Sequence, residues 1–404
     1  MLNPWRGLAG LPQAVWVIFG VTLVNRMGTM VLPFFVIYLT RRIGLTAEQA
    51  GLVLVCYGAG AFLTAPLAGK LCDRWKARHV MAAALLLSGA ILLVFPLAKG
   101  FQAILIITIL WAIVSEAFRP ASLAILSEAV APKQRKAAFS LSRLAINLGM
   151  SIGPAVGGFL AIYSFTALFI VDGATSLLAG FLLVSLPLRA GQGDDQPPHE
   201  LTATAPAGNI GALRDVRLLY FIAAFLPALF VFFQTQGALP LFLVRNLQMT
   251  EATYGLLFTI NTGLIILFEV PLNLAMARWP HHLATALGAM LCGAGFGALA
   301  VSSGVWSVAL TVVVWTFGEM ILFPSSSAQI ADIAPAAQRG AYMGYYVMTF
   351  SLAFMVGPWL GLAVMEMFGA TTLWLGTLGC GMASAVMMFF ARAASQRQPR
   401  AAES

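Results

Sequence analysis

Long apolar stretches alternate with short polar stretches along almost the whole chain. Each apolar stretch holds about twenty or more residues, enough to cross a hydrocarbon core of about 30 Å as a helix that rises about 1.5 Å per residue. These stretches must be helical in a bilayer, because lipid offers no hydrogen-bond partner to open backbone groups. The pattern predicts twelve membrane-spanning helices, over residues 13–40, 48–71, 79–97, 103–127, 138–162, 165–187, 216–244, 252–276, 283–302, 305–330, 340–365 and 371–392.

The predicted helices form two homologous sets of six. Pro120 and Gly153 recur as Pro324 and Gly357, in each case 204 positions later (324 − 120 = 204 and 357 − 153 = 204). Parallel repeats of this kind imply a pseudo-twofold axis along the membrane normal, with a binding site between the halves. The stretch between the two sets is polar and contains several Gly and Pro residues, as in an irregular linker. The expected domains are an N-terminal six-helix bundle over 1–188, a cytoplasmic linker over 189–214, a C-terminal six-helix bundle over 215–392 and a cytoplasmic tail over 393–404.

Composition and charge agree with a polytopic membrane protein. Hydrophobic residues make up 60% of the chain and charged residues 9%, far from the balance of a soluble domain. A net charge of +8 would suggest a nucleic-acid partner for a soluble protein. Here, however, sixteen of the twenty-three Lys and Arg residues lie at the termini and in the even-numbered loops, and four lie in the odd-numbered loops. By the positive-inside rule both termini are cytoplasmic. We therefore expect a multi-pass protein of the cell membrane, the inner membrane in a bacterium, without a nucleic-acid partner.

Motifs for metal binding and for enzyme chemistry are absent from this sequence. The four cysteines have no ligand-like spacing, and the pair His281-His282 has no clustered ligands beside it, so no metal site is expected. The chain contains no Walker loop, nucleophile elbow or zinc-helix motif. These observations argue against ATP-driven transport and against an enzyme. No cofactor is expected.

Two motifs carry a resemblance to a known family. The segment from Gly69 to Arg78, GKLCDRWKAR, resembles the G-x-x-x-D-R-x-G-R-R signature of the major facilitator superfamily. The segment from Gly149 to Gly158, GMSIGPAVGG, resembles the G-x-x-x-G-P-x-x-G-G signature of its proton-driven antiporters, particularly the twelve-helix drug:proton antiporter family. The resemblance implies an all-α membrane protein with twelve transmembrane helices in two pseudo-twofold-related six-helix bundles, the major facilitator fold. The chain departs from the family at Lys76, where the motif has glycine, and at Thr108, where many antiporters have an arginine.

Three charged residues lie near the middle of predicted spans, namely Arg26, Glu116 and Glu319. A charge at the centre of a bilayer costs about 2.5–3.5 kcal/mol on insertion scales, so it needs a partner or water. Because the resemblance implies that helices 1, 4, 7 and 10 line a central cavity, we expect these side chains to share one aqueous pocket. Glu116 and Glu319 are the predicted proton-coupling residues. The predicted substrate-cavity residues are Asn25, Arg26, Thr29, Ser115, Arg119, Gln234, Gln236 and Trp315.

Residues near helix ends and in the glycine motif form a predicted gating set. Asp73 and Arg74 are interpreted as a latch that bonds to the neighbouring half in the outward-open state, and the alternative is a solvated loop that only sets topology. Glycine lets another helix approach closely, and a proline such as Pro154 bends its span. The full set is Gly69, Asp73, Arg74, Arg78, Arg143, Gly149, Gly153, Pro154, Gly157 and Gly158.

Alternatives remain open for several of these residues. Glu116 and Arg119 lie three positions apart and can instead form an ion pair that merely locks the fourth helix. Asp172 in the sixth helix and Glu269 in the eighth are secondary candidates for direct participation.

Three functions are compatible with these features. The leading hypothesis is a proton-coupled secondary transporter that exports small lipophilic compounds or drugs by alternating access, through a rocker-switch movement of the two halves. The second is a proton-coupled importer of an anionic metabolite or chelate, held by Arg26 and Arg119. The third is a transport-inactive receptor or lipid-handling protein on the same scaffold. For the leading hypothesis the expected partners are a small-molecule substrate, protons and the lipid bilayer, and we expect a monomer.

Overall fold

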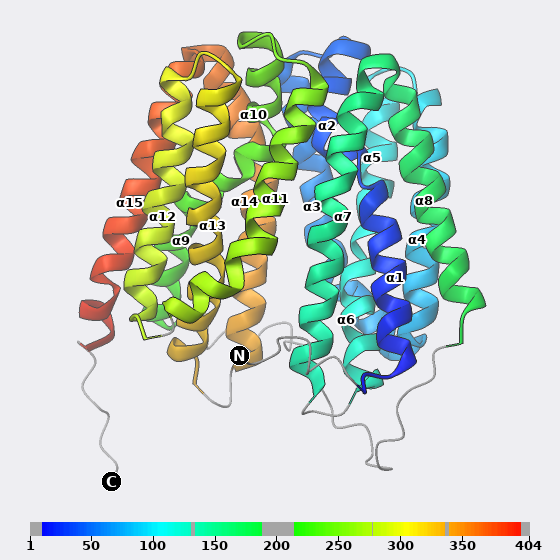
Figure 1. The fold of residues 1–404 in the computed structure, drawn as a ribbon, viewed down its shortest axis with the longest axis horizontal. Coiled ribbons are helices and arrows are strands. Elements are labelled where there is room, and N and C mark those ends of the chain that lie inside the picture. The colour runs from blue at the N-terminus through cyan, green and yellow to red at the C-terminus, as the bar shows by residue number, and fades with distance from the viewer. Residues whose placement is uncertain (1–9, 131–133, 188–213, 277, 336–338, 397–404) are drawn as a thin grey trace. The chain divides into compact units, whose positions relative to one another are not determined.

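The computed structural model describes residues 10–130, 134–187, 214–276, 278–335 and 339–396. Of the described residues 90% are helical, and none of them lies in a strand. Twelve helical segments among them are long and apolar enough to cross a membrane, which confirms the predicted number and order of spans (Figure 1). Most ends agree with the prediction to within a few residues, but the second and seventh segments end at Thr64 and Gln236, before the predicted ends at 71 and 244. In chain order the α-helices are α1 (Gln13–Gly28), α2 (Val31–Ile37), α3 (Ala47–Arg74), α4 (Ala77–Val94), α5 (Phe101–Glu116), α6 (Phe118–Ala129), α7 (Arg135–Tyr163), α8 (Phe165–Ser185), α9 (Val216–Phe232), α10 (Ala238–Leu241), α11 (Glu251–Ala275), α12 (His281–Gly297), α13 (Val305–Ile333), α14 (Arg339–Phe368) and α15 (Ala370–Gln396).

Three of the spans are interrupted, a feature that the apolar pattern did not predict. The first span consists of α1, α2 and a π-helical turn over Tyr38–Arg42. The seventh consists of α9, a 3-10 turn over Phe233–Gln236, α10 and a π-helical turn over Phe242–Asn246. The fourth span is divided at Ala117, between α5 and α6. Hydropathy does not register such breaks, because they depend on partners that other helices supply to the freed backbone groups.

The first and seventh spans break at equivalent positions of the sequence repeat. α1 ends at Gly28 and α9 ends at Phe232, which is 204 positions later (232 − 28 = 204). The π-helical turns begin at Tyr38 and Phe242, with the same separation (242 − 38 = 204). The repeat detected in the sequence therefore extends to the shape of the backbone.

Packing divides the chain into two compact units. The first unit comprises Met1–Leu45, Cys56–Thr204 and Thr250–Thr262, and the second comprises Thr46–Val55, Ala205–Met249 and Gly263–Ser404. α3 and α11 therefore each contribute one end to each unit. The expected linker over 189–214 and tail over 393–404 lie almost entirely outside the described residues, and the predicted domain boundaries stay predictions.

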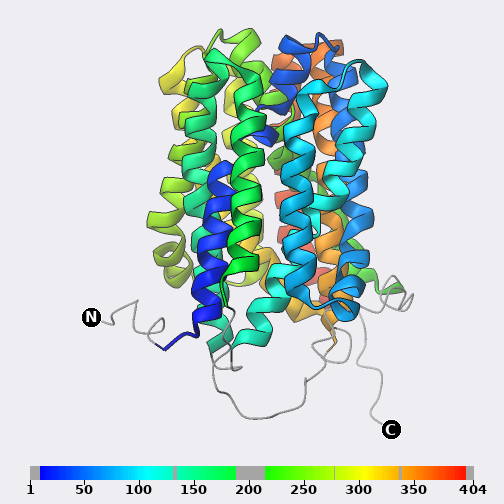
Figure 2. The ribbon, with the colours of Figure 1, turned by 90° about the vertical axis from the view of Figure 1, so that its right-hand side faces the viewer.

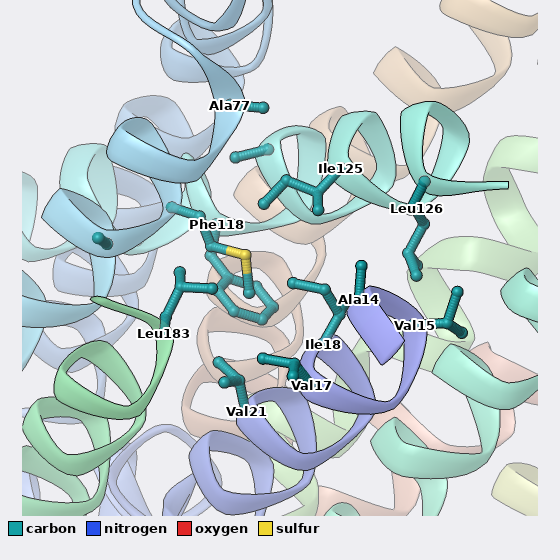
Figure 3. Packing of buried hydrophobic residues seen from close by; sticks show 14 of the residues in the cluster. Ala14, Val15, Val17, Ile18, Val21, Ala77, Phe118, Ile125, Leu126 and Leu183 are labelled. Atoms are coloured by element: carbon teal, nitrogen blue, oxygen red, sulfur yellow. The ribbon is translucent and has the colours of Figure 1, made fainter. Parts of the chain in front are cut away.

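Small residues let the helices of the first unit approach closely. A Cβ atom on Gly89 of α4 would lie 2.7 Å from the carbonyl oxygen of Gly173 on α8, so these helices meet at a pair of glycines. α1 packs along α7 and α8 (Figure 2). An apolar cluster at α1 includes Ile18, Phe118 and Leu183 (Figure 3). These three residues come from α1, α6 and α8, so the cluster packs these helices against one another.

Glycines have the same role in the second unit. A Cβ atom on Gly293 of α12 would lie 2.7 Å from the Cα of Gly381 on α15. A Cβ atom on Gly318 of α13 would lie 2.6 Å from the backbone nitrogen of Cys292, also on α12. These contacts hold α12 against both α13 and α15.

Candidate functional site

A carboxylate from the sixth span holds the break in the first span. The Oδ2 atom of Asp172 on α8 accepts hydrogen bonds of 3.1 Å from the backbone N–H groups of Met30 and Val31, where α2 begins. The side chain is buried, with 5% of Asp172 exposed. N–H groups at a helix start have no partner within the helix, so the carboxylate satisfies donors that the break leaves open. Asp172, a secondary candidate in the sequence, thus has a defined structural role.

Polar residues of the predicted cavity set form hydrogen bonds beside this break. The Nδ2 atom of Asn25 donates to the Oγ atom of Ser176 on α8 at 3.1 Å. The hydroxyl of Thr29 donates to the backbone carbonyl of Asn25 at 3.3 Å. The first bond ties α1 to α8, and the second is local to the end of α1, so these two side chains have structural partners as well as a predicted functional role.

Arg26 lies next to Asn25 and has no such partner. Its Nε atom is fully buried without a hydrogen bond, and its guanidinium forms no ion pair with any described carboxylate. The guanidinium carbon lies 5.3 Å from the centre of the Phe118 ring, a cation–π contact. The positive charge of Arg119 and the acids Glu116 and Asp172 also act on Arg26 electrostatically. A buried cation with unused donors is suited to binding an anionic group.

Glu116 is paired with a tyrosine of the second span. The hydroxyl of Tyr57 donates to Oε1 of Glu116 at 3.3 Å and lies 3.3 Å from the Oγ atom of Ser115. The ion pair with Arg119 that the spacing allowed is not formed between these two described side chains. The physical reason is local, because α5 ends at Glu116 and the side chain of Arg119, on α6, is exposed.

The glycine motif of α7 fits against the broken first span. A Cβ atom on Gly149 would overlap the Cβ of Arg26, and one on Gly153 would lie 3.0 Å from the carbonyl oxygens of Arg26 and Met27. Gly157 faces Met30 in the same way. α7 therefore approaches the break to a distance that only glycine permits at these positions.

The last residues of the glycine motif face α11 within the first unit. A Cβ atom on Gly158 would overlap the carbonyl oxygen of Glu251, and a Cβ atom on Gly255 would overlap the carbonyl oxygen of Pro154. This close packing agrees with the first part of the sequence interpretation, namely approach of another helix. A gating role for the motif stays a prediction.

In the second unit the equivalent break is held by an amide. The Nε2 atom of Gln234, in the 3-10 turn after α9, donates to the carbonyl oxygens of Phe230 and Gly357, each at 2.9 Å. A Cβ atom on Gly361 would overlap Oε1 of Gln234, so glycine is needed there to make room. Gln236, also in the predicted cavity set, has a buried Oε1 atom without a hydrogen bond.

Two further predicted residues lie where α13 packs on α12. Trp315 is 4% exposed, and its ring lies 5.3 Å from that of Phe296. A Cβ atom on Gly295 would lie 2.6 Å from the backbone nitrogen of Trp315, so the tryptophan occupies a tight contact between helices. Glu319 is half-buried and interacts electrostatically with Cys292 on α12. A role for Glu319 as a proton carrier stays a prediction.

An aromatic cluster in the second unit was not expected from the sequence. The rings of Phe225 and Tyr346 stack at 5.6 Å, and Phe350 lies edge-on to Phe225 at the same distance. Phe323 lies 5.4 Å from Phe350 and 4.9 Å from Phe232. The cluster joins α9, α13 and α14. The i, i+4 spacing of Tyr346 and Phe350 was the available signal, but it reads equally as ordinary helix packing.

The predicted gating charges are placed at helix ends. Arg78 donates to the carbonyl oxygens of Leu183, Val184 and Leu186 at 2.8–2.9 Å, so it caps the end of α8. Arg74, at the end of α3, is exposed. Arg143 is the exception, because it lies within α7, away from the helix ends, and is exposed. The side-chain positions at Gly69 and Asp73 lie outside the described part of the structure. Glu269, a secondary candidate outside the gating set, is half-buried on α11.

Tyr57 is the polar partner that sequence reasoning missed. Tyr57 is the single tyrosine of α3, which is the signal that could have found it. Its partner on α5 could not be identified without the fold. Among the described residues, no group of three or more His, Cys, Asp or Glu side chains could hold a metal ion.

The chain matches a family model over most of its length and resembles several named proteins at low identity. The model of the Major Facilitator Superfamily matches residues 18–245 and 235–404. The uncharacterized MFS-type transporter YqjV of Bacillus subtilis is 26% identical over 359 residues, covering 88% of this chain and 87% of the relative. A Na(+), Li(+), K(+)/H(+) antiporter of Planococcus maritimus is 24% identical over 395 residues, covering 89% and 91%. The quinolone resistance protein NorA of Staphylococcus aureus is 25% identical over 158 residues, covering 39% and 40%.

Solved structures share the fold at low sequence identity. A variant of the nucleoside transporter NupG matches with a TM-score of 0.78 and 14% identity, over 94% of this chain and 99% of that chain. A POT family transporter in complex with 5-aminolevulinic acid matches with a TM-score of 0.75 and 18% identity, over 97% and 99%. Together with the twelve spans, these matches confirm the predicted fold class.

Proposed function

The chain belongs to the major facilitator superfamily, a family of transporters rather than enzymes, and from this premise we propose that it exports small lipophilic molecules in exchange for protons. In this proposal it works as a monomer in a bacterial inner membrane, with both termini in the cytoplasm, by alternating access of its two halves. Membership of this family makes the protein a multi-pass membrane transporter of small molecules.

The observation that carries the proposal is the setting of Glu116. This acid lies within the fourth membrane span, and its hydrogen-bond partner is the neutral hydroxyl of Tyr57 rather than the guanidinium of Arg119. Ionisable groups inside membrane spans are costly and mark proton or substrate pathways. A carboxyl group with a neutral partner can take up and release a proton without breaking an ion pair. Glu116 is therefore the first candidate for the proton site, with Glu319 as the second.

Two further observations support export of lipophilic molecules. The aromatic cluster around Phe323 supplies ring faces of the kind that line sites for apolar ligands. Among the relatives, one is named a quinolone resistance protein and another a cation/proton antiporter. These names describe those proteins, and they favour an antiporter over an importer for this chain.

The test is transport by purified protein in proteoliposomes with an imposed pH gradient, using a lipophilic fluorescent dye. We expect dye accumulation that requires the gradient in the parent. Glu116→Gln should abolish gradient-driven accumulation but leave dye exchange, and Glu319→Gln would behave in the same way if that acid shares the proton. Glu128→Gln is the matched control, because Glu128 is exposed near the end of α6. Accumulation that ignores the gradient in every variant would exclude proton coupling.

A second function, proton-coupled import of an anionic compound, is favoured by one specific observation. The buried Nε atom of Arg26 has no hydrogen bond, and no described carboxylate pairs with its guanidinium. A substrate carboxylate would satisfy those donors. The same proteoliposomes separate the two functions, because in import the substrate moves in the same direction as the protons, whereas in export it moves in the opposite direction.

A further inference from the structure

The breaks in the first and seventh spans occupy equivalent positions but are held by chemically different groups. Met30 corresponds to Gln234 in the repeat (234 − 30 = 204). At Met30, the backbone N–H donates to the carboxylate of Asp172 at 3.1 Å. At Gln234, the side-chain amide donates to the backbone carbonyl of Gly357 at 2.9 Å. One break is therefore held by a group that can be protonated, and the other by a group that cannot.

The repeat offers no second carboxylate at the position of Asp172. The equivalent residue is Gly376 on α15 (376 − 172 = 204), and a Cβ atom there would meet no heavy atom within 4 Å. The carboxylate is therefore specific to the first unit. It is not a general requirement of the fold for stabilising a broken span, because in the second unit a side-chain amide, that of Gln234, lies at the equivalent break.

The charged surroundings of Asp172 are simple. Arg26 on α1 is the charged side chain that acts on it electrostatically. Of the other described cations on helices packed against α8, Arg78 on α4 donates to carbonyls at the far end of α8, and Arg143 on α7 is exposed. His79 on α4 is exposed as well. The two N–H groups of the break and Arg26 are therefore the groups that respond to the charge on Asp172.

We propose that Asp172 is a proton-binding hinge cap, whose protonation releases the N–H groups of Met30 and Val31 and loosens the break in the first span. A carboxylate offers only acceptors, whereas a protonated carboxyl group donates from one oxygen and accepts more weakly. The backbone donors left without a full partner then favour a different local arrangement, because unsatisfied buried donors are costly. The role of this hinge in transport rests on the proposed function.

Protonation of Asp172 would also affect Arg26, through the backbone at the break. Gly153 of α7 packs against the carbonyl oxygens of Arg26 and Met27, immediately before the break. A change in the backbone at the break therefore changes the position from which the Arg26 side chain reaches Phe118. In this way a proton on α8 would alter the guanidinium on α1 without contacting it.

Amide hydrogen exchange of the purified full-length protein in detergent tests the hinge. We would measure peptides that cover Met30 and Val31 between pH 8 and pH 5, and correct for the intrinsic pH dependence of exchange. The segment around Gln234 in the same protein is the internal control. We expect amide exchange at the first break to rise roughly tenfold or more relative to the control segment as pH falls. The reason is that protonation of Asp172 weakens the charge-assisted hydrogen bonds that protect the N–H groups of Met30 and Val31. An equal pH dependence of amide exchange in the two segments of the parent protein would overturn the proposal.

Asp172→Asn keeps an acceptor oxygen but cannot titrate, so its exchange at Met30 and Val31 should not depend on pH beyond the control segment. A variant that retains the parent's pH dependence would equally overturn the proposal, since another group would then be responsible. The comparison within the parent stands even if this variant does not fold. Failure of proton-driven flux in proteoliposomes, with pH-dependent exchange intact, would reject proton-coupled export and leave the hinge in place.

Discussion

Arg41 and Glu251 form an ion pair of 2.8 Å between the π-helical end of the first span and the first turn of α11. Only 11% of the Glu251 side chain is exposed, compared with 45% of that of Arg41. The repeat-equivalent arginine, Arg245 (245 − 41 = 204), pairs with Glu366 instead, and both of those side chains are more exposed. The two repeats thus use the same arginine position to anchor different helices.

This difference predicts unequal effects of two matched substitutions. Glu251→Gln leaves a largely buried amide facing Arg41, and it should lower the free energy of unfolding by about 1 kcal/mol. Glu366→Gln should change it by less than about 0.5 kcal/mol, because exposed pairs contribute little. Thermal unfolding in detergent provides the measurement. Equal losses in the two variants would contradict the view that burial of Glu251 matters.

The close packing of the α7 glycine motif predicts that a larger side chain there lowers the stability of the protein. A Cβ atom on Gly149 would overlap the Cβ of Arg26 and lie 2.8 Å from its backbone carbon. Gly149→Ala should therefore destabilise the protein by about 1–3 kcal/mol, as overpacking does elsewhere. Gly376→Ala is the control, because no heavy atom lies within 4 Å of its Cβ position. The control should be neutral or stabilising by up to about 1 kcal/mol, since alanine favours helix. A neutral Gly149→Ala would argue against the contact.

The contacts of Asp215 predict how the stability of the protein depends on pH. It caps α9 by accepting from the backbone N–H of Arg217 at 2.8 Å, pairs with the Arg217 guanidinium, and accepts from Tyr342 on α14. Burial alone would raise the pKa of Asp215, but these hydrogen bonds and the positive charge outweigh it and lower the pKa to about 2.

A lowered pKa in the folded state means that the ionised form of Asp215 contributes stability above its unfolded pKa of 3.8. That contribution decreases as pH falls toward about 2. Asp215→Asn should therefore cost up to about 2 kcal/mol at neutral pH, and the difference from the parent should shrink between pH 4 and pH 2. Thermal unfolding of both proteins across this range gives the measurement, and a difference that stays constant with pH would exclude the ionised cap.

Two substitutions of Arg26 distinguish a role of its charge from direct binding of the substrate. Arg26→Lys keeps the positive charge but loses the planar fork, whereas Arg26→Gln loses both. We expect the lysine variant to keep transport within about threefold and the glutamine variant to lose about tenfold or more, because a cation over Phe118 balances the acids Glu116 and Asp172. Initial rates at several substrate concentrations separate KM from kcat. A large rise in KM for the lysine variant would instead identify Arg26 as a ligand for a substrate carboxylate.

Parts of the candidate site could be anticipated and parts could not. The stripe of Asn25, Arg26 and Thr29 was visible from spacing within one helix, and the structure places all three at the break. The partner of Glu116 was not visible, because Tyr57 lies 59 positions away on another helix. Spacing alone favoured Arg119, which is near in sequence but exposed.

The sequence by itself determined the twelve spans, the two repeats of six helices and the family, because each can be read from residue types and their spacing along the chain. A run of apolar residues must form a helix in lipid, and glycine and proline motifs are read directly from consecutive letters. Tertiary structure alone decided which groups hold the breaks in the first and seventh spans. The carboxylate of Asp172 is 142 positions from Met30, and the Gln234 amide is 123 positions from Gly357. A backbone donor can leave its helix only where packing brings such an acceptor within hydrogen-bonding distance, so the breaks belong to the fold and not to the pattern.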